Sequence, residues 1–218
     1  MRLILIRHGQ TTSNVAGALD TAAPGADLTD LGREQAAALP AALDDERIGA
    51  IFVSNLIRTQ QTAAPLAAAK GLTPIIRDGI REVEAGELEM RSDREAIVSY
   101  LSTFAKWAAE DYSERIPGGE SGTDAFDRFD AVVAEAASLG HDTVVIVSHG
   151  AMLRYWVARA TINVDAEFVT KNDLTNTAIV VVSGDLARGW YTETWTGEAV
   201  GGPRLTDLTA DGPAASAT

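Results

Sequence analysis

LILIRHGQTTSN, residues 3–14, joins four apolar residues directly to an Arg-His pair and a glycine. Apolar and β-branched side chains suit a strand interior, and such a short run is typical of a strand buried on both faces. Arg7, His8 and Gly9 are none of these. The stretch therefore predicts a buried strand over Leu3–Ile6 that stops abruptly and presents a cation and an imidazole at its end.

A second stretch, TVVIVSHGAML at residues 143–153, repeats this design. A β-branched run is again followed by a histidine, His149, and a glycine. In open parallel sheets, ligands bind in the crevice beyond the carboxyl ends of the strands. Two strands that are far apart in the sequence are therefore expected to deliver His8 and His149 to one edge of a sheet.

Two further strands bring charged side chains to the same edge. The run AIFV at residues 50–53 is followed by Arg58, in the first turn of a predicted helix, and a strand ending near Arg77 leads into Glu82. A cation at a helix N-terminus is unfavourable unless it serves an anion, because the helix dipole is positive there. The sequence predicts a cluster of five side chains, which are His8, His149, Arg7, Arg58 and Glu82.

Strands and helices alternate along the chain, which favours an α/β fold of three layers, with a mainly parallel central sheet covered on both faces. Strands are predicted at residues 3–6, 50–53, 73–77, 143–147, 178–182 and 190–195, and helices at residues 30–42, 58–69, 92–110 and 151–160, with another through residues 126–133. We expect a single domain over residues 1–200. From about residue 201 the composition turns to Gly, Pro, Ala and Ser, which predicts a disordered tail over residues 201–218.

The composition limits the classes of function. The chain has 218 residues, of which 46% are hydrophobic, enough for one sizeable core. It has no cysteine, which excludes disulfides and thiolate metal sites, and its formal charge of −13 does not attract nucleic acid or anionic membranes. The run Leu3–Ile6 is too short for a signal peptide or a membrane span, so we expect a cytoplasmic protein. Whether it is a monomer or a homodimer stays open.

The predicted cluster suits a phosphoryl group. Guanidinium groups match phosphate oxygens two at a time, a neutral imidazole can attack phosphorus, and a protonated carboxylic acid can deliver a proton to the leaving oxygen. The chain has no Gly-x-Ser-x-Gly motif for acyl transfer, and neither a Walker A loop nor a Gly-x-Gly-x-x-Gly motif for a nucleotide. Two arginines beside the histidines would repel a metal cation. We therefore expect no metal and no cofactor, and a small phosphorylated molecule as the binding partner.

These motifs, in this order, resemble the histidine phosphatase superfamily, the phosphoglycerate mutase-like proteins. RHGQTTSN is similar to the opening signature of that family, DLTDLGREQA to the helix after it, VSNLIRTQQTA to the segment with the phosphate-binding arginine, and REVEAGELE to the loop with the proton donor. IPGGES, at residues 116–121, is typical of the phosphatase branch. The resemblance covers roughly residues 2–182 and implies a phosphoglycerate mutase-like fold.

The resemblance also implies a role for each residue of the cluster. His8 is the nucleophile and becomes a phosphohistidine. Glu82 is the general acid, which later activates water for hydrolysis. The phosphoryl oxygens are bound by Arg7, Arg58 and His149, with a further hydrogen bond from Asn14. The implied activity is hydrolysis of a small phosphorylated metabolite, a phosphomonoesterase reaction without a metal.

Three points stay open. A phosphoglycerate mutase would use the same site for phosphoryl transfer, although mutases of the family carry a longer, basic insertion after the acid loop, and the basic residues between Gly86 and Pro117 are here mixed with acids. A non-catalytic protein that binds a phosphorylated ligand, or a scaffold, is the other alternative. Glu84 lies in the same acidic loop as Glu82 and is the alternative proton donor.

Two residues near the predicted phosphate depart from the family pattern. Ser13 stands where an aromatic residue is common, and Asp20 lies in a loop, residues 15–27, where many relatives place a neutral polar side chain against the phosphate. A carboxylate there would repel phosphate, so we expect Asp20 either to point away or to meet a cationic part of the substrate. The helix predicted over residues 92–110 is a candidate lid over the leaving group.

Overall fold

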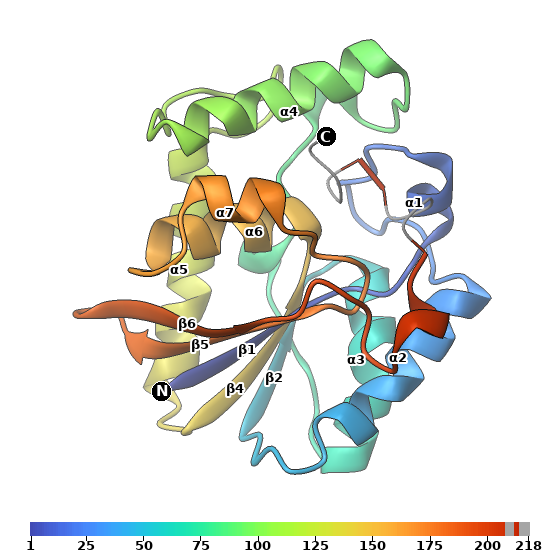
Figure 1. Cartoon of the computed structure of the whole chain (residues 1–218), viewed down its shortest axis with the longest axis vertical. Helices are drawn as coiled ribbons and strands as arrows, with labels where there is room; N and C mark the ends of the chain where they lie inside the picture. Colours follow the sequence, from blue (N-terminus) through green and yellow to red (C-terminus); the bar gives the residue numbers. More distant parts are fainter. Residues whose placement is uncertain (208–211, 214–218) are drawn as a thin grey trace.

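The computed structural model describes residues 1–207 and 212–213, and six strands of this part form one sheet, in the order β3-β2-β4-β1-β5-β6 (Figure 1). Its strands are β1 (Arg2–Arg7), β2 (Ala50–Val53), β3 (Ile75–Ile76), β4 (Thr143–Ser148), β5 (Ile179–Asp185) and β6 (Gly189–Trp195). The first four are parallel to one another, whereas β5 is antiparallel to β1 and β6 is antiparallel to β5. The sheet is therefore mainly parallel, as the sequence predicts.

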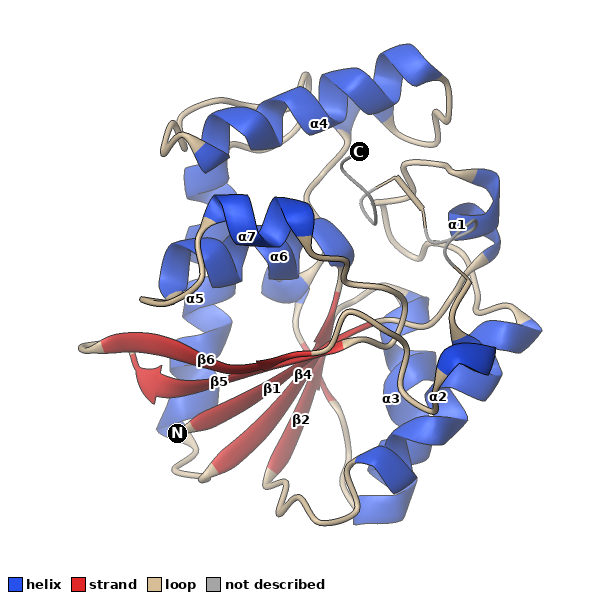
Figure 2. Ribbon diagram, in the orientation of Figure 1, coloured by secondary structure: helices blue, strands red, loops and turns tan. Residues whose placement is uncertain are grey.

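Helices cover both faces of this sheet (Figure 2). One face carries α2 (Asp30–Ala42) and α3 (Ile57–Lys70), and the other carries α5 (Gly122–Ser138), α6 (Gly150–Ala160) and α7 (Ala166–Lys171). The alternation of side chains along β1 explains the two layers. Leu3 and Leu5 join the core under α5 and α6, whereas Ile4 and Ile6 join the core under α2 and α3. The predicted three-layer α/β architecture is confirmed.

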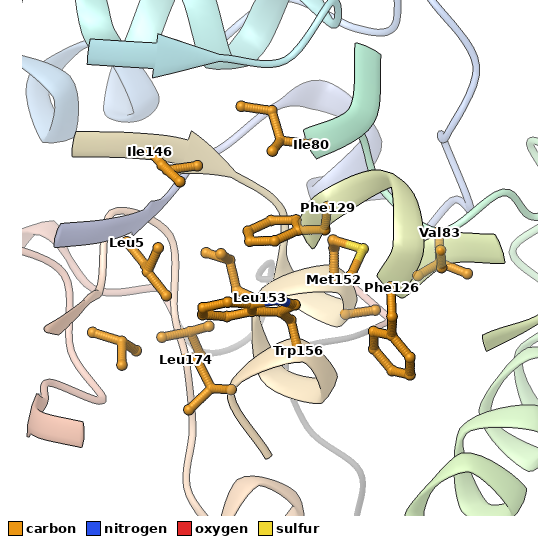
Figure 3. Packing of buried hydrophobic residues seen from close by; sticks show 14 of the residues in the cluster. Leu5, Ile80, Val83, Phe126, Phe129, Ile146, Met152, Leu153, Trp156 and Leu174 are labelled. Atoms are coloured by element: carbon orange, nitrogen blue, oxygen red, sulfur yellow. The ribbon is translucent and has the colours of Figure 1, made fainter. Parts of the chain in front are cut away.

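The core under α6 fixes the strand ends that carry the two histidines (Figure 3). Leu153 and Trp156 of α6 lie against Leu5 of β1 and Ile146 of β4. Phe129 of α5 packs on Trp156, with ring centroids 4.9 Å apart. All these side chains are fully buried, so large-to-small changes among them are expected to cost about 2–5 kcal/mol each.

Helix ends follow the capping residues in the sequence. The Thr29 side chain accepts a hydrogen bond from the Gly32 N–H at the start of α2, and Gly71 ends α3 in the left-handed conformation. The helix predicted over 92–110 is shorter, because Asp93 caps α4 (Arg94–Ala108) through the Ala96 N–H. None of the helices in the described part of the chain is both long and apolar enough to cross a membrane.

The segment predicted as a disordered tail starts with ordered structure. Pro203–Leu205 form a 3₁₀ helix, η3, beside α2. Leu205 is buried, and its carbonyl oxygen accepts a hydrogen bond from Gln35 Nε2 at 2.6 Å. Composition did not indicate this turn, because only one apolar side chain, Leu205, packs against the rest of the protein there. The rest of the predicted tail, apart from residues 212–213, lies outside the described residues.

The outer edge of β6 is covered by the segment after α6. The Ile162 N–H donates to the Trp190 carbonyl oxygen at 2.9 Å. The Asn163 side chain then takes both backbone groups of Thr192, accepting from its N–H at 2.8 Å and donating to its carbonyl oxygen at 2.9 Å. The amide of Asn163 therefore occupies backbone groups that another strand could otherwise bind at this edge of the sheet.

Candidate active site

The ends of β1 and β4 place the two predicted histidines side by side. The two strands are paired in register, with Arg7 opposite Ser148, and the His8 N–H donates to the Ser148 carbonyl oxygen at 3.0 Å. The imidazole rings of His8 and His149 lie with their centroids 5.2 Å apart and their planes at 57°. The juxtaposition expected from two similar strand ends is therefore present.

A hollow of about 430 Å³, open to solvent, lies at this edge of the sheet. Its lining includes four of the five side chains of the predicted cluster, together with Asn14. His149 is fully buried beside His8 and is the one member of the cluster outside the lining. The other described residues of the lining are Thr11, Ser13, Ala18, Leu19, Asp20, Thr21, Tyr100, Gly212 and Pro213.

The backbone turn after His8 depends on glycine. A Cβ atom on Gly9 would stand 2.7 Å from the Gly32 carbonyl oxygen, and one on Gly32 would stand 2.1 Å from the Gln10 carbonyl oxygen. The chain after β1 therefore touches the first turn of α2 backbone to backbone. This contact explains why glycine follows the histidine.

The hydrogen bonds of His8 leave one ring nitrogen available as a nucleophile. Its Nδ1 lies 2.8 Å from the Gly9 carbonyl oxygen, which can only accept, so Nδ1 carries the proton and Nε2 keeps its lone pair. Burial lowers the pKa of His8 well below the usual value, and the nearby charges of Arg58 and Arg7 lower it further. His8 is therefore a neutral imidazole at neutral pH.

His149 has a different hydrogen-bond arrangement. Its Nε2 lies 2.8 Å from Ser54 Oγ, at the end of β2, while its Nδ1 has no hydrogen-bond partner among the described residues. Burial lowers the pKa of His149 well below its usual value, and Arg58 is the strongest of the charges that lower it further. Ser54 was not predicted as a site residue, because its partner is 95 positions away in the sequence.

Two buried guanidinium groups supply the positive charge of the hollow. Arg7 is 2% exposed and donates from Nη1 to the Leu174 carbonyl oxygen at 2.7 Å. Arg58 is 3% exposed and donates from Nη2 to the Asp20 carbonyl oxygen at 2.7 Å. Its Nε and Nη1 find no hydrogen-bond acceptor in residues 1–207 or 212–213. Burial lowers the pKa of Arg58, and the carboxylates of Asp20 and Glu82 oppose that shift.

Glu82 is held at the N-terminus of α6. Its two carboxylate oxygens accept hydrogen bonds from the backbone N–H groups of Ala151, at 3.1 Å, and Met152, at 2.9 Å. The helix that follows His149 therefore anchors the predicted proton donor. Glu84 lies elsewhere: its carboxylate accepts from Arg81 at 2.7 Å, and it does not line the hollow. The geometry thus favours Glu82 over Glu84.

Asn14 turns its amide nitrogen toward the hollow. Its Oδ1 accepts from the Thr11 N–H and the Thr11 hydroxyl in a capping box at the start of α1 (Thr12–Ala16). Asn176 Nδ2 lies 3.4 Å from the same oxygen. Because Oδ1 already accepts from Thr11, the NH₂ group of Asn14 is the part of the side chain that can bind a ligand in the hollow.

Asp20 does not follow the first of the two expectations for it, and contact with a cationic part of the substrate stays a prediction. It lines the hollow rather than pointing away, and its carboxylate already faces a cation of the protein, with Oδ2 3.6 Å from Arg58 Nη1. Ser13, the other departure from the family pattern, donates to the same oxygen at 2.7 Å. The two unusual residues are therefore hydrogen-bonded to each other. The sequence singled out both residues but did not indicate that they would contact each other.

Helix α4 reaches the hollow through Tyr100. The Tyr100 hydroxyl donates to the Val83 carbonyl oxygen at 2.9 Å, next to Glu82 in the chain. Phe104, one turn later, stacks on Tyr155 of α6, with ring centroids 4.7 Å apart. The helix predicted as a lid is thus packed on both the acid loop and α6.

The sequence of the whole chain identifies the family to which this arrangement of side chains belongs. The family model described as histidine phosphatase superfamily (branch 1) matches residues 3–196. This chain belongs to the histidine phosphatase superfamily. The match includes every residue of the predicted cluster and confirms the resemblance drawn from the motifs.

Curated relatives of this histidine phosphatase span more than one activity. PE-PGRS family protein PE_PGRS11 of Mycobacterium tuberculosis is 33% identical over 90% of the chain, which spans only 36% of that protein. Phosphoserine phosphatase 1 of Hydrogenobacter thermophilus is 32% identical, over 71% of the chain and 73% of the relative. A probable phosphoglycerate mutase, GpmB of Erwinia tasmaniensis, is 30% identical, over 89% and 92%.

A solved structure shows the same architecture. The alpha-ribazole phosphatase from Shigella flexneri superposes with a TM-score of 0.72 at 29% identity, over 93% of this chain and 99% of that one. The family and its phosphatase members support classing this histidine phosphatase as a phosphoric monoester hydrolase.

Proposed function

We propose that this histidine phosphatase hydrolyses a small phosphorylated metabolite through a phosphohistidine on His8, without a metal. The observation that carries the proposal is the hydrogen bond from His8 Nδ1 to the Gly9 carbonyl oxygen, because it leaves the Nε2 lone pair at the hollow. A neutral, oriented imidazole beside two buried guanidinium groups is suited to attack a phosphoryl group that those groups bind.

In the first step, His8 Nε2 attacks phosphorus. The nitrogen–phosphorus bond forms as the bond to the leaving oxygen breaks, and a protonated Glu82 transfers its proton to that oxygen. Arg58 offers Nε and Nη1, which lack protein acceptors among the described residues. Arg7 and Asn14 line the same hollow. These donors stabilise the charge that spreads over the phosphoryl oxygens in the transition state.

His149 completes the binding of the phosphoryl group in this proposal. When the Ser54 hydroxyl donates to Nε2, the imidazole proton lies on Nδ1, the nitrogen without a partner in the described part of the chain. That N–H then donates to a phosphoryl oxygen behind the attacking nitrogen. Ser54 acts as a positioning residue, because it selects the tautomer of His149.

In the second step, water hydrolyses the phosphohistidine. The Glu82 carboxylate, left deprotonated by the first step, removes a proton from the water as its oxygen attacks phosphorus. The nitrogen–phosphorus bond breaks, inorganic phosphate leaves, and the neutral imidazole is restored. The backbone N–H groups of Ala151 and Met152 keep the carboxylate in place throughout.

Trapping the intermediate tests this proposal. The enzyme is mixed with p-nitrophenyl phosphate in the presence of a chelator and quenched in base, which preserves phosphohistidine, and its peptides are analysed by mass spectrometry. We expect full turnover with the chelator and a phosphoryl group on the peptide that contains His8. Loss of turnover with the chelator, or a label on another residue, would overturn the proposal.

A phosphoglycerate mutase is the second candidate, since the relative GpmB carries that name. Here Arg91 pairs with Asp93 and Arg115 pairs with Asp124, so these two basic residues after the acid loop are already neutralised. We therefore expect hydrolysis of 3-phosphoglycerate or other monoesters to exceed their isomerisation. Strong mutase turnover with negligible release of phosphate would reverse this order.

A further inference from the structure

The carboxylate of Asp20 is built into the wall of the hollow. Its Oδ2 accepts hydrogen bonds from Ser13 Oγ at 2.7 Å and from the Ala26 N–H at 2.9 Å. The side chain is only 7% exposed. One donor from α1 and one from its own loop thus hold the negative charge at a fixed place. In a poorly solvated site, that charge acts strongly on the bound molecule.

The loop that carries Asp20 closes directly on Arg58. A Cβ atom on Gly25 would stand 2.5 Å from Arg58 Nη1 and 3.4 Å from Asp20 Oδ1, so no side chain fits between the loop and the guanidinium group. Gly25 also has a φ of +71°, which favours glycine. The Asp20 carboxylate therefore lies close to this guanidinium group, with Oδ2 3.6 Å from Nη1, and both residues line the hollow.

The net positive charge around the hollow is small, because the Asp20 carboxylate offsets one of its two cations. Its described lining holds two cations, Arg7 and Arg58, and two carboxyl groups, Asp20 and Glu82. The two imidazoles are neutral because of their lowered pKa values. The phosphate group of a monoester adds negative charge to the hollow when it binds. A second anionic group on the leaving alcohol would add repulsion from Asp20, whereas an ammonium group would gain attraction.

We propose that Asp20 selects substrates by charge: it favours phosphate monoesters whose alcohol carries a cationic group within a few bonds of the phosphate, and disfavours those with a second anionic group. This inference rests on the proposed phosphatase activity. The class of substrate is therefore an amino-alcohol phosphate or a similar cationic ester.

Three esters with the same two-carbon chain test the proposal: phosphoethanolamine, ethyl phosphate and phosphoglycolate. Their alcohols are cationic, neutral and anionic, and each ester is compared with itself in the wild type and in Asp20→Asn. The asparagine carbonyl can still accept from Ser13 and Ala26. We expect the ratio of kcat/KM for phosphoethanolamine to that for phosphoglycolate to fall about tenfold, with ethyl phosphate changed by an intermediate factor.

The matched control is Asp27→Asn, which removes the same charge from an exposed position in the same loop. Asp27 accepts from Gln61 Nε2 at 2.6 Å, and asparagine keeps that acceptor. We expect the ratio to stay within twofold of the wild type. Equal slowing of all three esters in Asp20→Asn would mean that Asp20 only positions Arg58, and would overturn the proposal.

Binding of phosphonates tests the same inference without a variant and without turnover. Wild-type protein is titrated with 2-aminoethylphosphonate and with phosphonoacetate, which carry a cation and an anion at matched places. We expect the aminophosphonate to bind at least several times more tightly, and equal binding or the reverse order contradicts the proposal. If the wild type hydrolyses none of the three esters but still ranks the phosphonates in this way, the phosphatase activity fails while the charge selectivity stands.

Discussion

The ends of β1 and β4 look alike in the sequence but differ in their surroundings. Each is a β-branched or apolar run that ends in His-Gly, and each places its histidine at the same edge of the sheet. His8 bonds through Nδ1 to the carbonyl oxygen of its own neighbour and lines the hollow. His149 bonds instead through Nε2 to Ser54 and is fully buried. The same motif at the same location therefore leaves a different ring nitrogen of each histidine without a partner among the described residues.

His8→Ala is the most direct test of the difference between the two histidines. We expect turnover to fall by at least about 10³-fold and the phosphoenzyme to disappear, because His8 is the only imidazole among the described residues that line the hollow. Rates with p-nitrophenyl phosphate and circular dichroism measure activity and folding together. A folded variant that keeps substantial activity would remove His8 from the mechanism.

Glu82, which the N-terminus of α6 holds in place, is tested by Glu82→Gln. Glutamine fits the same place but has no acidic proton, so esters with poor leaving groups should slow by about 10²–10⁴-fold. The rates are compared as kcat/KM, which reports formation of the phosphoenzyme and not its hydrolysis, and on this measure p-nitrophenyl phosphate should slow far less, because its leaving group needs no proton. Glu84→Gln is the matched control and should leave both rates near those of the wild type. Equal slowing of both esters in Glu82→Gln would point to another proton donor.

His149→Ala should be less severe than His8→Ala and should leave the phosphoenzyme detectable. The variant loses one hydrogen-bond donor to the phosphoryl group, a change that typically costs about 10²–10³-fold in rate. His141→Ala, at an exposed loop position, is the control histidine and should have no effect. Complete loss of labelling on His8 in a folded His149→Ala protein would show that the two histidines do not have separate roles.

Ser54→Ala sharpens the comparison further, since it changes only the hydrogen bond of His149 Nε2. We expect kcat/KM to fall about tenfold, because the Nδ1 tautomer is no longer fixed. In the double variant with His149→Ala, the serine change should have little additional effect. Additive losses in that cycle would show that Ser54 acts on something other than His149, such as the Leu56 N–H that donates to it.

The pH dependence gives the smallest expected effects. Both histidines have pKa values lowered well below 6.5, so the acid limb of the activity profile should lie well below pH 6.5. Below pH 6.5 the unfolded chain binds protons that the folded chain does not, so the free energy of unfolding should decrease as pH falls. His149→Ala should flatten that slope in denaturant titrations. An acid limb near pH 6.5 would indicate a solvated His8.

The sequence predicts the site residues that directly follow buried strands much better than the contacts between distant segments. His8, Arg7 and His149 follow directly from buried strands, whose apolar runs are unmistakable and whose ends must meet at one edge. The partners of Asp20 and Ser54 are side chains from distant segments, and local patterns do not encode such contacts. The same limit applies to Glu82, whose anchor at Ala151 is 69 positions away.

Some predicted boundaries also depend on tertiary contacts. The strand predicted over residues 73–77 has only two residues, Ile75 and Ile76, because it pairs with β2 at just those positions at the rim of the sheet. Ser121 caps α5 in a capping box with Asp124, whereas the carboxylate of the neighbouring Glu120 forms an ion pair with Arg128. Capping residues can be recognised locally, whereas ion-pair partners cannot.

The amide of Asn163 has a consequence for how copies of this chain can meet. Because it occupies both backbone groups of Thr192, a strand from another molecule cannot extend the sheet there without first displacing a side chain that is already well bonded. At high concentration or temperature, this edge should therefore not pair with strands of other molecules. Asn163→Ala would leave the backbone groups of Thr192 free to form such pairs.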